Sequence, residues 1–293
     1  MINEPNKTSI IVLICAFMTV LLWASAFTFT KVALVSFTPE ALGSIRYLFA
    51  SGLLLIFAIV KRISLPKIKD VPLFFLSGFA GFALYVYAFN MGSVSVSAAT
   101  SSILVSTAPI ITAILAAIFY KEKINKICWF AIAIEFFGIL IIALHEGVFS
   151  MNRGIEWILI SALCLGIYNI MQRKLLKKYT PFESTTYSIF AGTILLTFFL
   201  KDGLIQLHQA PILQIVNVVC LGLFPGAIAY YLWATAISKS KKITTVTNFM
   251  FITPLLSTIF GLVVIREVPS VTTVIGGCII VYGSILFQKL NTT

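Results

Sequence analysis

The feature that most constrains the fold is a run of 50 residues, from Val71 to Tyr120, that contains no charged side chain. Such a run is long enough for two helices of roughly 20 residues, the length that crosses a hydrocarbon core about 30 Å thick. Over all 293 residues, 59% are hydrophobic and 11% are charged, whereas a soluble domain carries about 25% charged residues. One water-soluble core cannot bury this much apolar surface, so we predict an integral membrane protein.

The apolar runs predict an all-α fold with ten membrane-spanning helices. They show neither the short alternation nor the turn spacing of barrel strands, so we interpret them as helices. The predicted spans are 9–31, 39–60, 71–90, 98–120, 127–144, 154–173, 182–200, 211–237, 243–265 and 270–288.

The basic residues gather in alternate loops, which indicates topology. If the N-terminus is cytoplasmic, sixteen of the 21 Lys and Arg residues fall in cytoplasmic segments. The opposite side then holds four, Lys31, Arg153, Lys201 and Arg266, and Arg46 lies inside the second span. We therefore predict a multi-pass protein of the cytoplasmic (inner) membrane with both termini in the cytoplasm. The net charge of +11 reports this topology and is not a nucleic-acid signal.

A helical pattern occurs twice in the chain, 145 residues apart. Pro109 and Glu122 frame the segment PIITAILAAIFYKE, and Pro254 and Glu267 frame PLLSTIFGLVVIRE. Twelve residues separate Pro from Glu in both segments, and a basic residue precedes each Glu. The pattern indicates an internal repeat.

Two further blocks repeat in the same order. KVALVSFTPE (31–40) aligns with RKLLKKYTPF (173–182), and YVYA (85–88) aligns with YLWA (231–234). Each half holds five predicted spans, an odd number, so the second half must enter the membrane from the other side. We predict two inverted repeats, 1–147 and 148–293, an arrangement of many secondary transporters with substrate near the midplane between them.

These residues carry a family resemblance. The early Trp followed by small residues and a Lys (WASAFTFTK), the Arg next to an aromatic residue (IRYLFA) and the repeated Pro…Glu helix resemble the drug/metabolite transporter superfamily, EamA type. The resemblance covers nearly the whole chain. It implies ten helices in two inverted five-helix repeats around a central cavity, often with export of amino acids or related metabolites. The family's frequent Trp in the sixth helix is replaced here by Leu165 or Gly166, so the substrate cannot be carried over.

Two ionisable residues lie inside predicted spans. Arg46 follows Pro39 by about 10 Å of helix, and a charge at this depth should face the bundle interior or a wet cavity. Arg46 is a candidate for binding a substrate carboxylate or for gating, with structural pairing as the alternative. Glu135, at the centre of the fifth span, is a candidate for proton coupling, with a neutral packing carboxyl as the alternative.

Aromatic and amide side chains supply the other site candidates. By the repeat, Tyr87 and Trp233 are expected to face each other across the pathway, where such rings suit aromatic, apolar or cationic substrates. The alternative is an interfacial aromatic belt. The candidates for substrate binding or gating are Trp23, Arg46, Tyr85, Tyr87, Asn90, Tyr168, Asn169, Tyr231, Trp233 and Asn248.

Two prolines and two cations occupy equivalent positions in the repeats. Pro109 and Pro254 each remove a helix hydrogen bond, so they are candidates for hinges at the cavity, with packing kinks as the alternative. Lys31 and Arg173 each end a helix. We predict that both are helix-end anchors whose long side chains reach the interface, with direct substrate contact as the alternative.

No nucleophile–base constellation, phosphate loop or metal cluster is visible in the sequence. We predict a non-enzymatic secondary transporter with no cofactor or metal, which exports an amino acid or a related small organic metabolite by alternating access. Its partners would be the small-molecule substrate and the lipid bilayer, without nucleic acid, and a homodimer is left open. The alternatives are an importer or exchanger of an organic cation or of a nucleotide-like or vitamin-like metabolite, a membrane-embedded lipid enzyme and a channel.

Overall fold

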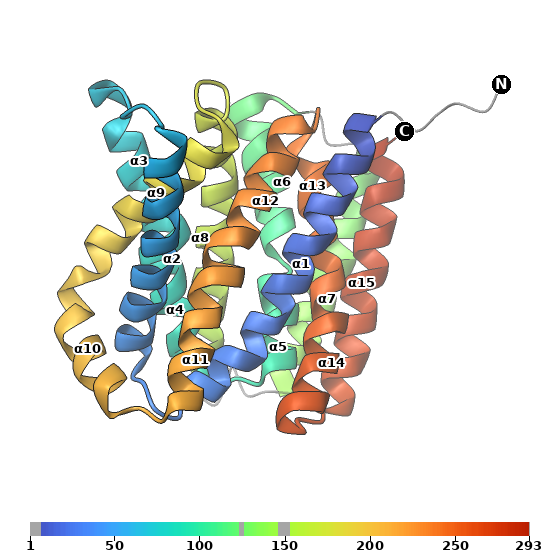
Figure 1. Ribbon diagram of the computed structural model, residues 1–293. Coiled ribbons are helices and arrows are strands. Elements are labelled where there is room, and N and C mark those ends of the chain that lie inside the picture. The colour runs from blue at the N-terminus through green and yellow to red at the C-terminus, as the bar shows by residue number, and fades with distance from the viewer. Residues whose placement is uncertain (1–6, 123–125, 146–152, 293) are drawn as a thin grey trace.

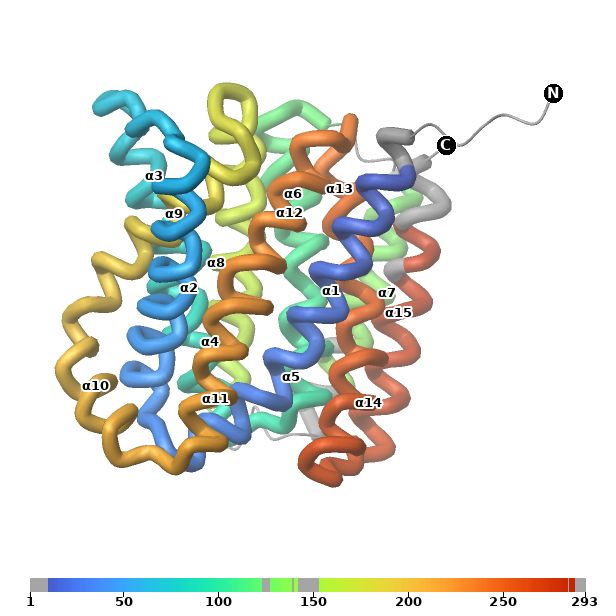
Figure 2. Tube along the Cα trace, viewed as in Figure 1, coloured from blue at the N-terminus to red at the C-terminus, as the bar shows by residue number. Residues whose placement is uncertain are grey.

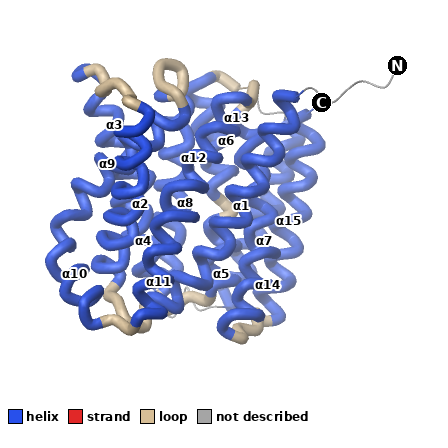
Figure 3. Tube along the Cα trace, viewed as in Figure 1, coloured by secondary structure: helices blue, strands red, loops and turns tan. Residues whose placement is uncertain are grey.

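The computed structural model describes residues 7–122, 126–145 and 153–292, and every regular element in these ranges is helical, as Figure 3 shows. In chain order the elements are α1 (Lys7–Ala33), α2 (Pro39–Lys61), η1 (Ile68–Asp70), α3 (Val71–Gly78), η2 (Phe79–Leu84), α4 (Tyr85–Ser93), α5 (Ala98–Val105), α6 (Ala108–Tyr120), α7 (Lys126–His145), α8 (Arg153–Leu175), α9 (Pro181–Leu196), η4 (Thr197–Phe199), α10 (Leu200–Gln209), α11 (Ile212–Leu221), η5 (Gly222–Ile228), α12 (Ala229–Lys239), α13 (Ile243–Thr247), η6 (Asn248–Ile252), α14 (Thr253–Ile265) and α15 (Val271–Thr292). Of the short elements, η2 and η5 are π-helical and the others are 3-10 turns.

The membrane character of the fold is confirmed over the described residues. Eight helical stretches there are long and apolar enough to cross a membrane: Ile10–Ala33, Pro39–Lys61, Ile68–Ser93, Ala98–Tyr120, Arg153–Leu175, Pro181–Gln209, Ile212–Lys239 and Ile243–Ile265. The other two predicted spans coincide with α7 and α15, whose apolar described parts, Ile127–Gly138 and Val271–Phe287, are shorter. The seventh predicted span continues past residue 200 as α10.

The repeated Thr-Pro dipeptides start helices. Thr38 caps α2 and accepts a hydrogen bond from the backbone N–H of Ala41, and Pro39 occupies the first turn. Thr180 caps α9 in the same way and forms a reciprocal capping box with Glu183. A Thr side chain satisfies a free N–H of the first turn, and Pro needs no partner there. The dipeptides of the sequence therefore mark the same structural position twice.

The repeated basic–Glu dipeptides end helices. Lys121, after α6, and Arg266, after α14, both adopt the left-handed conformation with φ of 53° and 52°. This conformation is uncommon for residues other than Gly. The N–H of each following Glu returns to the helix, to the carbonyl of Ala116 or Gly261. The two turns send Glu122 and Glu267 away from their own helices by the same local geometry.

Five of the described spans are not continuous α-helices, and four of these five form two matching pairs. The spans α5–α6 and α13–α14 break immediately before Pro109 and Pro254, each the second residue of its helix. The spans α3–α4 and α11–α12 contain the π-helical turns η2 and η5. Interrupted helices inside a membrane protein are found where the backbone faces protein or a cavity. The matching pairs of interruptions therefore point to the middle of the bundle.

The helices form one bundle in which α7 and α15 lie together at one edge and α10 lies at the opposite edge (Figure 1). The beginning of α1 and the end of α15 lie at the same end of the bundle (Figure 1). The colour gradient of the tube shows that α1 and α8, the first helix of each half, run in opposite directions (Figure 2).

The contact between α7 and α15 is reciprocal. A Cβ added at Gly138 would lie 2.7 Å from Cγ1 of Ile280, and one added at Gly283 would lie 2.7 Å from Cγ of Glu135. By the 145-residue offset of the repeat, Gly283 is the counterpart of Gly138 and Ile280 is the counterpart of Glu135. Gly138 therefore meets the counterpart of Glu135, and Gly283 meets Glu135 itself. Contacts of this kind are those of an interface with two-fold symmetry. The glycines let the two helices approach closely.

Candidate functional site

A cavity lies at the centre of the bundle, where elements of both halves meet. It is narrow, with about 20 Å³ open to the centre of a water-sized sphere. A single water needs roughly 10–15 Å³ by this measure, so the cavity has room for about one water. Its walls are formed by Trp23, Ala26, Phe27, Arg46, Tyr85, Phe89, Val105, Ser106, Leu165, Tyr230, Met250 and Thr253.

The two broken spans meet at this cavity. Ser106, in the break between α5 and α6, donates a hydrogen bond to the carbonyl of Ser102 at 2.8 Å and contacts the carbonyl of Met250 at 3.3 Å. Met250 lies in η6, in the corresponding break before α14, and Thr253 begins that helix. Breaks in equivalent helices thus contact each other directly at the cavity wall.

Arg46 supplies the positive charge of the cavity. The residue is 3% exposed, its Nε has no hydrogen-bond partner among the described residues, and its Cζ lies 5.7 Å from the centre of the Tyr47 ring. The π-helical η5 packs against the same turn, since a Cβ at Gly222 would lie 2.6 Å from the carbonyl oxygen of Arg46. A buried guanidinium without an ion pair in the described chain favours an anionic ligand, because a buried charge is costly unless it is paired.

Aromatic rings form much of the cavity wall. Trp23 packs against Tyr230 and Trp233, with ring centroids 5.0 and 4.9 Å apart, and its Nε1 donates to the carbonyl of Pro225 at 3.3 Å. Tyr85 stacks on Phe89 with centroids 6.0 Å apart. The cavity therefore combines one cationic group with a largely apolar, aromatic surface, the composition of a site for a small organic molecule.

The structure places three of the ten binding candidates, Trp23, Arg46 and Tyr85, on the cavity wall. Two more form a buried hydrogen-bonded chain near it. Trp233 Nε1 donates to Oδ1 of Asn169 at 2.8 Å, and Nδ2 of Asn169 donates to Oγ1 of Thr112 at 3.1 Å. This chain connects α12, α8 and α6.

The remaining candidates lie elsewhere. Tyr168 is fully buried, and Asn248 lies in η6 at 8% exposure. Asn90 donates to the carbonyl of Pro39 at 2.8 Å, and the Tyr231 ring packs on Phe182. None of these four lines the cavity described above.

The structure does not place Tyr87 and Trp233 facing each other across the cavity. The Tyr87 ring lies 5.5 Å from Trp157 and 6.2 Å from Phe199, whereas Trp233 packs on Trp23. The alignment of YVYA with YLWA misses a difference between the π-helical turns, because η2 ends directly before Tyr85, whereas Ala229 and Tyr230 separate η5 from Tyr231. The aligned residues therefore follow their π-helical turns at different distances, and such a turn changes the face on which later residues lie.

The π-helical η5 also makes the position of Tyr230 hard to predict from the sequence. This residue lines the cavity and directly follows η5 and Ala229, while the neighbouring Tyr231 faces Phe182. The sequence marks the Tyr-Tyr pair but does not say which ring faces inward. The Gly and Pro residues of GLFPGAI are the only signal that the helix is irregular there.

Glu135 lies outside the central cavity. It is fully buried where α7 packs on α15, with its Cγ beside Gly283. For metal binding, no group of three or more His, Cys, Asp or Glu residues comes together in the part of the chain that the structure describes. The chemistry available at the cavity is therefore that of a guanidinium, hydroxyls, backbone carbonyls and aromatic rings.

Comparison with known proteins agrees with this architecture. The model of the EamA-like transporter family matches residues 10–144 and 152–288. The uncharacterized transporter YdfC of Bacillus subtilis (strain 168) is 36% identical over 287 residues, which cover 98% of this chain and 93% of that protein. A Streptantibioticus cattleyicolor protein named "Probable terminal-alkyne amino-acid exporter" is 30% identical over 274 residues, covering 93% of this chain and 91% of that protein.

A solved crystal structure has a similar fold. It superimposes with a TM-score of 0.68 and 17% sequence identity, and the match covers 95% of this chain and 97% of that chain. At this identity the likeness shows the shared fold alone.

Proposed function

Because the chain belongs to the EamA-like transporter family, we propose that it is a secondary transporter that exports an amino acid or a related small organic acid through the central cavity. The observation that carries this proposal is the position of Arg46, whose buried guanidinium lines the cavity without an ion pair in the described chain.

The composition of the cavity supports a substrate with two different ends. A carboxylate can form two parallel hydrogen bonds with a guanidinium, the strongest ionic contact available to a small acid. The rings of Trp23, Tyr85 and Tyr230 give the rest of the molecule an apolar surface. The similarity to a protein named as an amino-acid exporter agrees with this substrate class.

The size of the cavity supports alternating access. Space of about 20 Å³ suits roughly one water and is too small for an organic metabolite. Substrate must therefore bind in a conformation in which the helices around the cavity have moved apart. The breaks in the spans α5–α6 and α13–α14 lie at the cavity, and the helices can move relative to each other at these breaks.

We also propose that residues 1–147 and 148–293 are two inverted five-helix repeats, ten spans in total, in the cytoplasmic membrane. The two separate matches to the family model, the opposite directions of α1 and α8 and the reciprocal α7–α15 contact support the inversion. The basic loops, which favour the cytoplasmic side, support cytoplasmic termini.

Purified protein in liposomes tests the function. We expect saturable uptake of radiolabelled amino acids, with faster exchange when the same amino acid is trapped inside, because a carrier returns faster when loaded. The amides of the same amino acids should be transported poorly. A preference for the amides or for organic cations would contradict the role of Arg46 and favour a cation carrier that uses the aromatic wall. Non-saturable flux without exchange would favour a channel.

A further inference from the structure

Two ion pairs connect the halves of the molecule. Nζ of Lys31, in the last turn of α1, lies 3.7 Å from Oε2 of Glu267, after α14. Nη2 of Arg173, in the last turn of α8, lies 3.2 Å from Oε1 of Glu122, after α6. Lys31 and Arg173 lie at helix ends as the sequence predicts, and the structure also pairs each with a carboxylate of the other half. The four side chains are 15–26% exposed, so solvent screens these pairs less than it screens a surface pair.

The two ion pairs are equivalent by the repeat. Glu267 follows Glu122 by 145 positions, and Arg173 aligns with Lys31 in the repeated block that precedes Thr-Pro. Each pair therefore joins the first helix of one half to the turn after the fourth span of the other. The ends of α1 and α14 lie at one end of the bundle, and the ends of α6 and α8 lie at the other (Figure 1). The pairs thus lie at opposite ends of the pathway.

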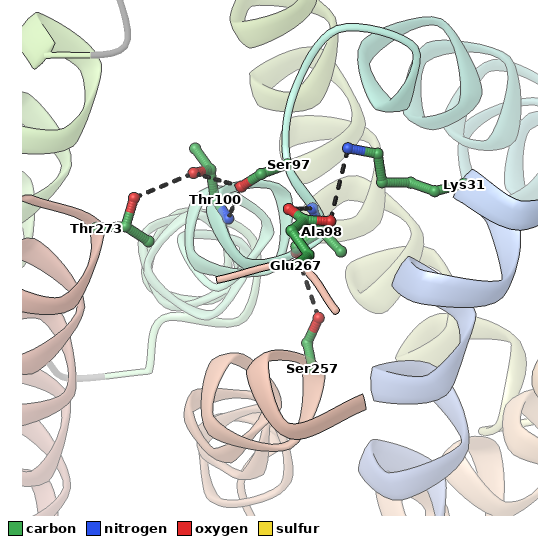
Figure 4. A network of polar contacts seen from close by, with 7 residues as sticks. All are labelled: Lys31, Ser97, Ala98, Thr100, Ser257, Glu267 and Thr273. Carbon is green, nitrogen blue, oxygen red and sulfur yellow. Dashed lines mark hydrogen bonds and ion pairs between the residues drawn. The ribbon is translucent and has the colours of Figure 1, made fainter. Parts of the chain in front are cut away.

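The Lys31–Glu267 pair belongs to a polar cluster around the start of α5 (Figure 4). Oε1 of Glu267 accepts a hydrogen bond from the backbone N–H of Ala98 at 2.9 Å, at the start of α5. The backbone carbonyl of Ala98 accepts a hydrogen bond from Oγ of Ser257 at 3.3 Å. The far end of α5 supplies Val105 to the cavity wall. Movement of Glu267 would therefore release the first turn of a helix whose last turn contacts the site.

The Arg173–Glu122 pair has a similar connection. Nη2 of Arg173 also donates to the carbonyl of Lys241 at 2.9 Å, just before α13, which is the counterpart of α5. Arg173 lies one turn beyond Asn169, the centre of the buried Trp233–Asn169–Thr112 chain. At the other end, Lys31 lies one turn, about 6 Å, beyond Phe27 of the cavity wall. The two ion pairs therefore lie beyond the cavity on opposite sides, one turn past Phe27 along α1 and two turns past Leu165 along α8.

We propose that Lys31–Glu267 and Arg173–Glu122 are two equivalent gates that close opposite ends of the cavity, and that transport opens them in turn. Both pairs are formed in this structure, which agrees with a cavity of only about 20 Å³. The proposal rests on the proposed transport function for its purpose. It makes a prediction about accessibility that needs no substrate.

The test measures access to a cysteine in the cavity wall. Ser106→Cys is introduced after the two exposed cysteines, Cys220 and Cys278, are replaced by Ser. The protein is placed in liposomes with one orientation, and a membrane-impermeant maleimide is added from either side. Glu267→Gln should raise the labelling rate from one side, and Glu122→Gln from the other, each on the order of fivefold, the upper range for breaking a partly exposed ion pair.

A second variant at each end keeps the test independent of any one substitution. Lys31→Met should act on the same side as Glu267→Gln, and Arg173→Met on the same side as Glu122→Gln. The matched control is Lys178→Ala, which removes the 2.6 Å ion pair to Asp70. Lys178 is close in sequence to Arg173, but the Lys178–Asp70 pair has no equivalent in the other repeat. Ile215 occupies the position equivalent to Asp70. Labelling should not change in this control.

Two results would overturn the gates. One is increased labelling from the same side in the variants of both pairs, and the other is unchanged labelling in all four variants. A failure of the transport proposal would look different. In that case the opposite-sided labelling pattern would be intact, while wild-type protein would move no amino acid in the liposome assay.

Discussion

Arg46 is a buried cation, 3% exposed, with no ion pair in the described chain, and burying an unpaired charge is costly. If a substrate carboxylate completes its surroundings, Arg46→Lys should weaken binding, because lysine lacks the planar fork. Arg46→Ala should weaken it further, by roughly 10- to 100-fold in Kd, the usual range for a hydrogen bond to a charged group. Equilibrium binding of an amino acid and of its amide to purified protein measures both effects.

The amide and a second basic residue serve as controls. Arg46→Ala should change the affinity for the amide little, because the amide never uses the ionic contact. Lys61→Ala should leave both affinities unchanged, since Lys61 lies at the end of α2 over the ring of Phe182, away from the cavity wall. An equal loss for acid and amide would make Arg46 a structural residue.

Gly81 makes a prediction about packing. A Cβ at this position would lie 2.2 Å from Cδ2 of the fully buried Tyr168, so Gly81→Ala must displace a large ring. We expect a loss of about 1–3 kcal/mol in stability, as for other overpacked sites. Gly52→Ala is the control, because a Cβ there meets nothing within 4 Å and alanine favours a helix by up to about 1 kcal/mol. Thermal unfolding in detergent should separate the two variants, and equal melting temperatures would contradict the close contact.

At the scale of the element, the helix breaks concern the rate of transport. Pro109 and Pro254 lie in the first turns of α6 and α14, directly after the breaks. Replacing either with Ala restores a backbone donor and lets the helix extend backward, which should stiffen the break. We expect flux to fall more than substrate affinity, because a hinge acts in the conformational step. Flux and equilibrium binding on the same preparations decide this, and unchanged flux in both variants would leave the prolines as packing kinks.

Sequence periodicity predicts the elements well and their faces less well. The Thr-Pro starts and the basic–Glu ends repeat because each has a defined local geometry. The inward position of Tyr230 instead depends on the π-helical η5, which nothing in a 3.6-residue period reveals. The ion pairs of Lys31 and Arg173 were also missed, since their carboxylates are far away in sequence. The repeat alone could have suggested them, by placing a cation and a Glu at equivalent helix ends.

At the scale of the whole molecule, hydropathy and charge predict a membrane bundle because the bilayer allows few alternatives. The cavity is harder to predict, because it forms where two broken helices from different halves cross. Of the predicted site residues, Trp23, Arg46 and Tyr85 reach it. These lie on α1, on α2 and directly after η2, whereas the misplaced Tyr87 and Tyr231 lie further along the helices that follow π-helical turns.

The proposed topology can be tested with reporter fusions. A reporter at the C-terminus should be active in the cytoplasm, and one inserted after Gly92, near the end of α4, should lie on the opposite side. The reason is the excess of basic residues in the loops assigned to the cytoplasm. An external C-terminus, or both reporters on the same side, would contradict the orientation and the inverted repeat.

The reciprocal contact of Gly138 with Ile280 and of Gly283 with Glu135 has a geometrical consequence. If transport exchanges the conformations of the two halves, the exchange is itself a half-turn about the axis that relates them, and a half-turn leaves every point on its axis fixed. The α7–α15 contact lies on that axis, so it should be the same in both states while the gates and the cavity change. A covalent cross-link between α7 and α15, or attachment of the protein to a surface through these two helices, should therefore not stop transport.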